Sequence, residues 1–283
     1  MSIKSEVQRI KNGKILLKDE FAVNDVFIPD DVLINNYYEY LEYLKGDSNG
    51  GVIHDCSYLF KDGVRTGEIE NVLKCCEPTI CYSMFYNCGS QFNQTLIQTC
   101  DYSNCTNFAR MFEQASIKGE NGLAQDLILD GMDTSSATTM EYMFFNCKSE
   151  IIDMTSFDTK NITNMLSMFT GSSIGVKHIY GFSCEGAPHA ATGSTTIFSN
   201  NINTIYWKPG TGFGTHSTME SLTLDLNLIS LGVASIRNII ENIGENTTGL
   251  ERIILVRRPV FNQLTSTEKE TMANKGYTMV DVF

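Results

Sequence analysis

A short unit that recurs along the middle of the chain constrains the fold more than any other feature. Its mark is a hydrophobic residue followed by phenylalanine, and these phenylalanines are spaced 25, 27, 32, 25 and 29 residues apart. They are Phe60, Phe85, Phe112, Phe144, Phe169 and, in the weakest unit, Phe198. The spacing is too long for a coiled-coil heptad and falls in the range of repeat proteins. We therefore predict five or six stacked units between residues 52 and 207.

Alignment of the units on the phenylalanine shows which other positions they share. Hydrophobic residues recur four and seven residues before it, and a threonine recurs six residues before it. The first position holds Cys56, Cys81, Phe108, Met140 and Met165, the second holds Ile53, Pro78, Cys105, Ala137 and Ile162, and the threonines are Thr79, Thr106, Thr138 and Thr163. Such spacing predicts one apolar stripe on a short helix that the threonine caps. We expect Met140, Met165 and the phenylalanines to form the core.

Short hydrophobic runs lie between these predicted helices and are typical of strands. They occupy residues 95–97, 127–129, 150–153, 176–180 and 203–206. Each unit is then a brief strand, a turn and a short helix, which cannot bury its apolar side alone. Stacking would bury these sides together and align the strands as a parallel sheet, so the predicted fold class is α/β.

Three units also carry an aspartate eleven residues before the phenylalanine, namely Asp101, Asp133 and Asp158. Paired carboxylates can act as general acid and base in an enzyme. Aspartate side chains also accept hydrogen bonds from nearby main-chain amides, which stabilises turns. We interpret all three as turn residues, with paired catalytic carboxylates as the alternative.

Two of the units resemble a known family. The segments FDTKNITNMLSMFTGSS (157–173) and MDTSSATTMEYMFFNCKS (132–149) are similar to the BspA-like leucine-rich repeat, whose form is F-D-T-S-x-V-T-x-M-x-x-M-F-x-x-C. The similarity is partial over residues 101–115 and weakens toward both ends of the repeats. It implies a leucine-rich-repeat solenoid over residues 49–217 that serves surface recognition and adhesion rather than catalysis.

The chain is acidic, with 33 acidic and 21 basic residues and a formal net charge of −12. This charge would repel nucleic acids and anionic membranes, so we expect neither as a partner. The sequence has no apolar run of the length that a membrane-spanning helix needs, about 18 residues or more. Its opening residues are charged and lack the apolar stretch of a secretory signal, so no export signal is expected.

The nine cysteines fit core positions better than a metal site. Cys56 and Cys81 share one position of the unit, Cys88 and Cys147 share another, and residues in one column of a stack pack inward. There is no C-x-x-C pair and the four histidines show no ligand spacing, so we expect no metal and no cofactor. Equivalent cysteines could still form disulfides if neighbouring units lie about 5 Å apart. No P-loop, G-x-S-x-G or H-E-x-x-H motif is present, so no catalytic residue is predicted.

Residues 1–48 differ from the repeats and are predicted to form a small helical module. Pro29 and the two aspartates after it mark a helix start, and Lys45-Gly46 closes the helix. Four tyrosines, a residue type that suits interfaces, make it the candidate attachment surface: Tyr37, Tyr38, Tyr40 and Tyr43. A helix that caps the first repeat explains them equally well. The opening MSIKSEVQRI and the IPDD turn resemble the N-terminal module of bacteriophage virion proteins, which implies attachment to the particle.

Residues 218–283 predict longer strand and helix units that end the stack. Strands are expected at 221–227, 252–256 and 277–280, and helices at 233–243 and 265–275. The stretch LTSTEKETMANKGYTMV resembles the terminal segment of leucine-rich-repeat proteins from gut bacteria and their phages. A cap of this kind is needed because an open end would expose core side chains and free strand edges.

Together these features favour a phage virion structural protein, a tail or head appendage, that is not an enzyme and presents a leucine-rich-repeat surface to the host cell. The alternative is a bacterial cell-surface adhesin, which would need export. Other virion proteins would bind the N-terminal module, a host surface protein or glycan would bind the repeats, and a homo-oligomer is a further option. Candidate ligand contacts are Trp207 and Phe213, together with Tyr180 and Tyr206, which core packing explains at least as well.

Overall fold

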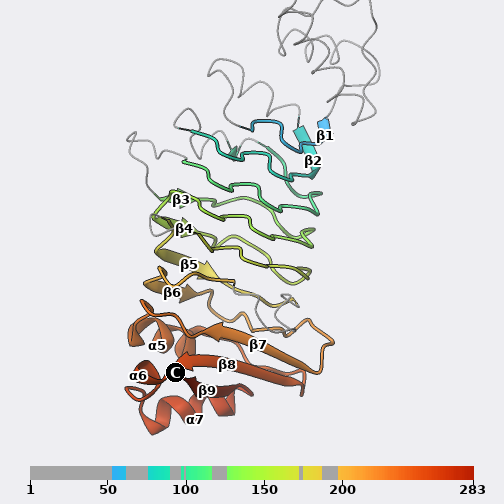
Figure 1. Ribbon diagram of the computed structural model, residues 1–283. Helices are drawn as coiled ribbons and strands as arrows, with labels where there is room; N and C mark the ends of the chain where they lie inside the picture. The colour runs from blue at the N-terminus through green and yellow to red at the C-terminus, as the bar shows by residue number, and fades with distance from the viewer. Residues whose placement is uncertain are drawn as a thin grey trace, which may run out of the picture.

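A computed structural model describes residues 53–61, 76–89, 97–98, 100–116, 126–171, 175–186 and 197–283. The chain runs in coils that lie one below another, and a unit with helices and longer strands closes the C-terminal end (Figure 1). All strand pairs among the described residues are parallel, which confirms the α/β class with a parallel arrangement. The predicted N-terminal module, residues 1–48, lies outside the described residues.

Three sheets hold the described strands. The first pairs β1 (Ile53–Asp55) with β2 (Cys76–Ile80). The second has the order β3 (Leu127–Ile128), β4 (Ile151–Asp153), β5 (His178–Phe182) and β6 (Thr204–Trp207). The third contains β7 (Ser221–Leu226), β8 (Glu251–Arg257) and β9 (Thr278–Val282). The described helices are α5 (Val233–Asn242), α6 (Arg258–Phe261) and α7 (Ser266–Asn274).

The strands of the second sheet lie where the hydrophobic runs predict them. The four runs from residue 127 to residue 206 overlap β3, β4, β5 and β6 in turn. Ile152, Ile179 and Ile205 are fully buried and lie opposite one another in the register. Because strand residues alternate between the two sides of a sheet, this register fixes which residues point away from the core.

The prediction of a short helix is wrong for the units whose turns the structure describes. Residues 82–87, 109–114 and 141–146 form runs of turns instead. The amides of Met140, Tyr142 and Phe144 donate to carbonyls of the next repeat, at 2.8–2.9 Å. The amides between them bond within the repeat, that of Met143 to the Met140 carbonyl and that of Glu141 to Thr139 Oγ1. Every second amide therefore links two repeats, whereas all interior amides of an α-helix bond within the helix.

Left-handed backbone conformations recur at the same two positions of each run. In these three runs the residues two before and two after the repeated phenylalanine have φ between 51° and 59°, as in Tyr142 (55°) and Asn146 (53°). Residues with a Cβ atom rarely adopt this conformation, so the hydrogen bonds across repeats must hold it. Inward side chains still recur every three or four residues, which is why the sequence pattern imitates a helix.

The threonines six residues before the phenylalanine do not cap helices. Their hydroxyl groups donate to main-chain carbonyls of the preceding repeat, Thr138 to Thr106 at 3.0 Å and Thr163 to Thr138 at 3.1 Å. The two earlier threonines of the column do the same. Ile53 and Pro78, also expected on helices, lie on β1 and β2. The repeated threonine is thus a link between repeats.

The repeated phenylalanines form one continuous column of stacked rings. Neighbouring rings are within 10° of parallel, with centroids 5.3–5.9 Å apart. All six side chains are at most 2% exposed, and Met140 and Met165 are fully buried in the same core. Equivalent residues in neighbouring repeats can stack on both faces, and each stacked pair adds about 0.5–1.5 kcal/mol beyond burial. The column thus ties the described repeats into one core.

The second sheet ends at β6 because α5 takes the place of a further strand. The amides of Ile205 and Trp207 donate to side chains of α5, to Ser235 Oγ at 3.2 Å and to Asn238 Oδ1 at 2.8 Å. A bare edge strand would leave these amides open to pairing with other chains. The helix therefore covers the edge of the sheet as well as part of the core.

The pattern of the terminal segment reflects helix capping. Thr265 and Glu268 form a capping box at the start of α7. Lys275 Nζ donates to three carbonyls at the C-terminal end of α5, at 2.7–3.0 Å, where a cation also favours the helix dipole. Gly276 follows with φ of 83°. The strands and helices predicted for residues 218–283 are confirmed, and the short helix α6 was not predicted.

Arg252 of β8 fixes the loop between β6 and β7 onto the third sheet. Its side chain is buried and donates to the carbonyls of Gly214, Ser217 and Met219 at 2.8–3.2 Å. A buried charge is costly unless hydrogen bonds replace its water. Here main-chain carbonyls supply those bonds, so the loop and the sheet depend on each other.

Phe144→Ala should lower the free energy of unfolding, measured by urea denaturation, by about 3–5 kcal/mol. The substitution removes a buried ring that stacks on both Phe112 and Phe169. Phe145→Ala is the matched control, because this ring is only partly buried and makes an edge contact with Tyr142. The control should cost about 1 kcal/mol. Equal losses for the two variants would show that the column does not hold the repeats together.

Ser167 tests the left-handed positions, since its φ is 52° and its side chain is only partly buried. Ser167→Gly should leave the free energy of unfolding unchanged or raise it by up to about 1 kcal/mol, because glycine adopts this conformation without strain. Ser167→Val should lower it by about 1–2 kcal/mol. Urea denaturation of both variants gives the comparison, and a valine tolerated as well as glycine would contradict the left-handed turn.

Candidate recognition surface

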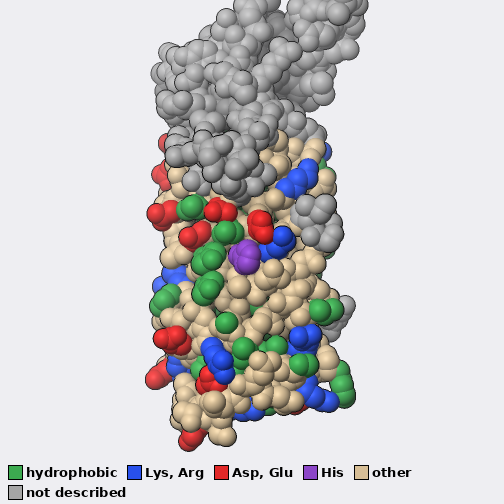
Figure 2. Space-filling model, turned by 90° about the vertical axis from the view of Figure 1, so that its left-hand side faces the viewer, with side chains coloured by type: hydrophobic (Ala, Val, Ile, Leu, Met, Phe, Trp, Pro, Cys, Tyr) green, Lys and Arg blue, Asp and Glu red, His purple; other side chains and the backbone are tan. Residues whose placement is uncertain are grey.

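The outward side of the second sheet carries hydrophobic side chains that the fold does not bury. Ile128, Asp153 and Tyr180 lie opposite one another in the register, and Tyr206 follows on β6. Ile128, Tyr180 and Tyr206 are 37–39% exposed. Figure 2 views the molecule from this side and shows hydrophobic, acidic and basic side chains around a histidine. Exposed hydrophobic groups that lie together are typical of binding surfaces.

Tyr180 and Tyr206 form a stacked pair on this side. Their ring centroids are 4.8 Å apart and their planes differ by 12°. One face of the Tyr180 ring is covered by Tyr206, so the other face is turned toward β4, where Asp153 is the direct neighbour. Stacking restrains both side chains, which reduces the entropy that a partner must remove on binding. Tyrosines are enriched at protein interfaces for their apolar body and polar tip.

Polar side chains surround the tyrosines. Asp153 Oδ1 accepts hydrogen bonds from the amide and the hydroxyl of Thr155, at 3.0 and 2.6 Å, and Oδ2 takes no part in them. His178 shares a 2.8 Å hydrogen bond with a threonine on β6. Lys177 forms a 2.8 Å ion pair with Glu150, which lowers the pKa of that carboxyl. Lys177, which precedes β5, is thus paired with Glu150, while Asp153 has no ion pair among the described residues.

Trp207 and Phe213, predicted as ligand contacts, are buried. Trp207 is 2% exposed, and its indole Nε1 donates to the Thr211 carbonyl at 2.7 Å. Phe213 is fully buried, and its amide donates to the hydroxyl of Tyr277, whose pKa burial raises to about 12. The loop after β6 folds back over the core, so the prediction that these two rings meet a ligand is wrong. The candidate attachment tyrosines Tyr37, Tyr38, Tyr40 and Tyr43 lie outside the described residues.

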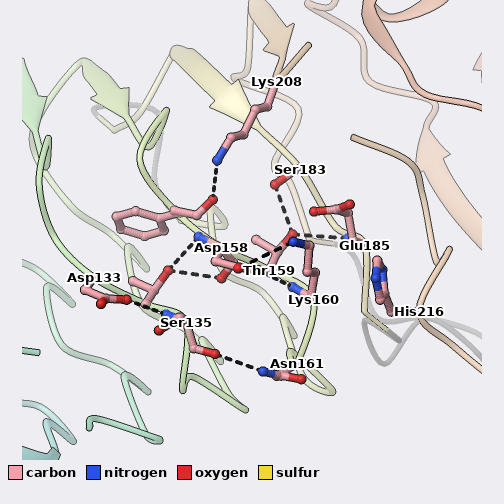
Figure 3. A network of polar contacts seen from close by, with 12 residues as sticks. Asp133, Ser135, Asp158, Thr159, Lys160, Asn161, Ser183, Glu185, Lys208 and His216 are labelled. Atoms are coloured by element: carbon pink, nitrogen blue, oxygen red, sulfur yellow. Dashed lines mark hydrogen bonds and ion pairs between the residues drawn. The ribbon is translucent and has the colours of Figure 1, made fainter. Parts of the chain in front are cut away.

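The repeated aspartates stabilise turns, as the sequence suggests. Asp101, Asp133 and Asp158 each accept a hydrogen bond from the amide two residues further on, at 2.9 Å. The bond from the Ser103 amide lowers the pKa of the Asp101 carboxyl. Figure 3 shows Asp133 and Asp158 in neighbouring repeats, where each carboxylate accepts a hydrogen bond from an amide of its own turn. These carboxylates therefore stabilise turns of the main chain.

The threonine after each of the last two aspartates ties repeats together (Figure 3). Thr134 Oγ1 donates to the Asp158 carbonyl at 3.0 Å and accepts from the Asp158 amide at 2.8 Å. Thr159 Oγ1 shares a 2.9 Å hydrogen bond with Ser183 Oγ and accepts from the Glu185 amide at 3.1 Å. Both threonines are at most 1% exposed. These buried hydroxyls are links between repeats, which explains the D-T pair of the repeat motif.

The eight cysteines among the described residues are all buried. Burial, and the neighbouring thiol of Cys105, raise the pKa of Cys81 well above its usual value. A thiol with a raised pKa stays protonated, whereas metal binding and disulfide exchange need the thiolate. In the part of the chain that the structure describes, no group of three or more His, Cys, Asp or Glu side chains could hold a metal ion. The helices described there are also too short or too polar to cross a membrane.

The middle of the chain is similar to a known family of proteins. Residues 76–182 match the family described as Mycoplasma protein of unknown function, DUF285. This span runs from β2 to the end of β5 and covers less than half of the chain. No curated protein and no solved structure matches the sequence.

Thr134→Val keeps the shape of the side chain but removes the hydroxyl that bonds both main-chain groups of Asp158. It should lower the free energy of unfolding, measured by urea denaturation, by about 1–3 kcal/mol, because a buried amide and carbonyl lose their partner. Thr163→Val is the matched control, since its exposed hydroxyl bonds a single carbonyl. The control should cost about 0.5–1 kcal/mol. A loss no larger for Thr134→Val would mean that its hydroxyl does not join the repeats.

Proposed function

We propose that the chain is a leucine-rich-repeat solenoid with a small helical N-terminal module, and that it serves recognition rather than catalysis. The observation that carries this proposal is the parallel stacking of the units, in which amide links, threonine hydroxyls and phenylalanine rings recur from one repeat to the next. Stacked repeats of this kind offer an extended surface on which side chains of successive units stand in rows. The engagement of the repeated aspartates and threonines in turns and links supports a structural role for them.

For the place of action we propose a phage virion, with the protein as an appendage of the tail or the head. The support is the N-terminal sequence, MSIKSEVQRI with the later IPDD turn, which resembles a particle-joining module. Other virion proteins would hold residues 1–48, and the repeats would face a host surface protein or glycan.

A bacterial cell-surface adhesin is the second candidate. It is favoured by the match of residues 76–182 to DUF285, a domain found in BspA-like surface proteins. Both candidates use the repeats for binding and differ in what holds the other end of the protein.

Fractionation of phage-infected and uninfected cultures of the source organism separates the two candidates. We expect mass spectrometry and immunogold labelling to find the protein in purified particles. Detection in the cell envelope of uninfected cells, without any in particles, would instead establish the adhesin. A protein found in neither place, and confined to the cell interior, would contradict both.

Removal of residues 1–48 should abolish incorporation into particles, because this module is proposed to make the contact with other virion proteins. The circular dichroism spectrum and melting temperature of the truncated protein should remain those of the folded repeats. Tyr58→Ala is the control, since Tyr58 is an exposed tyrosine outside the module and its loss should leave assembly intact. Normal assembly of the truncated protein would rule out the module as the attachment point.

A further inference from the structure

The protein already holds one arginine between a tyrosine and a carboxylate. The guanidinium carbon of Arg110 lies 4.4 Å from the ring centroid of Tyr142, and Nη1 donates to Glu113 at 2.8 Å. Cation–π attraction and a charge-assisted hydrogen bond act together in this arrangement. In this protein, therefore, a tyrosine ring and a carboxylate that lie close together bind an arginine.

Asp153 and Tyr180 present the same two groups without an arginine. They are direct neighbours on adjacent strands, β4 and β5. Tyr206 covers the far face of the Tyr180 ring, which leaves the near face turned toward Asp153. The bonds from Thr155 occupy only Oδ1 of Asp153. Because neighbouring strands are about 4.8 Å apart, a guanidinium laid on the near face of Tyr180 would reach Oδ2.

The charges around this pair favour a cation. Asp126 is partly buried and Asp130 is exposed at the two ends of β3, and neither has an ion pair among the described residues. Lys177 is paired with a carboxylate, and Lys208 Nζ donates to a main-chain carbonyl at 2.7 Å. Acidic and basic side chains both accompany the hydrophobic ones on this side (Figure 2), and these two lysines already have partners. Exposed Ile128 offers apolar surface to the methylene groups of an arginine side chain.

We propose that the outward side of the second sheet binds a partner protein through an arginine that lies between Asp153 and Tyr180. This inference rests on the proposed recognition function and names the chemistry of the partner, a cationic, arginine-bearing protein segment. Tyr206 holds the Tyr180 ring in place from the other side. A lysine would bind less well, because its ammonium has no planar face to stack and cannot form the two parallel bonds of a guanidinium.

Fluorescence anisotropy of a labelled nona-arginine peptide with the full-length protein tests this proposal. Asp153→Asn and Tyr180→Ala should each raise the dissociation constant about threefold to tenfold, because each removes one of the two groups that hold the guanidinium. A nona-lysine peptide should bind more weakly and respond less to Tyr180→Ala. The melting temperature of each variant shows that it is folded, and Asp153→Asn keeps the test valid if Tyr180→Ala does not fold.

Two substitutions outside this surface are the controls. Asp225 on β7 also accepts a hydrogen bond from the amide two residues further on, at 2.8 Å, so Asp225→Asn removes the same charge from the same kind of turn. Tyr58→Ala removes a tyrosine that is 46% exposed in a repeat near the other end of the stack. Both should leave the dissociation constant unchanged. Equal weakening by Asp153→Asn and Asp225→Asn would reduce the binding to attraction by the net charge and overturn the proposal.

Other outcomes separate this inference from the proposed function. Binding of a neutral glycan, maltoheptaose or chitohexaose, that depends on Tyr180 while nona-arginine binding does not, would overturn the arginine site and leave recognition standing. Peptide binding that no variant on the second sheet changes would do the same. The fractionation experiment decides the proposed function independently, because it does not depend on which face of the repeats binds.

Discussion

Hydrogen bonds from alternate amides to the next repeat are the constraint on which the rest of this structure depends. Each bond runs to the carbonyl just before the equivalent residue, from Met140 to Asn164 and from Phe144 to Met168, so that equivalent residues of neighbouring repeats lie side by side. Once that register is set, a residue type that recurs at one position of the unit makes the same contact between each pair of neighbouring repeats. Phenylalanines stack ring on ring, and threonine hydroxyls reach the carbonyl one repeat away. The same register forces left-handed conformations on residues such as Tyr142, which no isolated unit would adopt.

The sequence alone predicts the inward positions well and the backbone between them poorly. Short hydrophobic runs mark β3 to β6 because a strand needs only alternation over a few residues. The turn runs were mistaken for helices because both place inward side chains three or four residues apart. The difference lies in the acceptors of alternate amides, which belong to a repeat some 25 residues away and leave no local mark. The helices of the C-terminal unit were predictable because their caps, Thr265, Glu268 and Gly276, are local.

The candidate site divides in the same way. The aspartates could be recognised as turn residues, since their partners lie two residues further on. The exposure of Tyr180 and Tyr206 follows from alternation with the buried Ile179 and Ile205. Burial of Trp207 and Phe213 could not be foreseen, because it depends on a loop that Arg252 holds from β8, 38 residues after Gly214. Long-range polar contacts of this kind have no signature in the loop sequence itself.

The side chains at the outward positions of the second sheet have no such role in stabilising the fold. The core is formed by the opposite side of the strands, the edge of β6 is covered by α5, and the turn carboxylates bond the backbone. A threonine or serine at the positions of Tyr180 and Tyr206 would satisfy the same strand geometry and expose less hydrophobic surface. Two stacked tyrosines beside Asp153 therefore add an exposed aromatic surface that the sheet itself does not need. Arg110, Tyr142 and Glu113 show what such a pair of groups can hold, and this likeness is the reason for proposing that Asp153 and Tyr180 bind an arginine of another molecule.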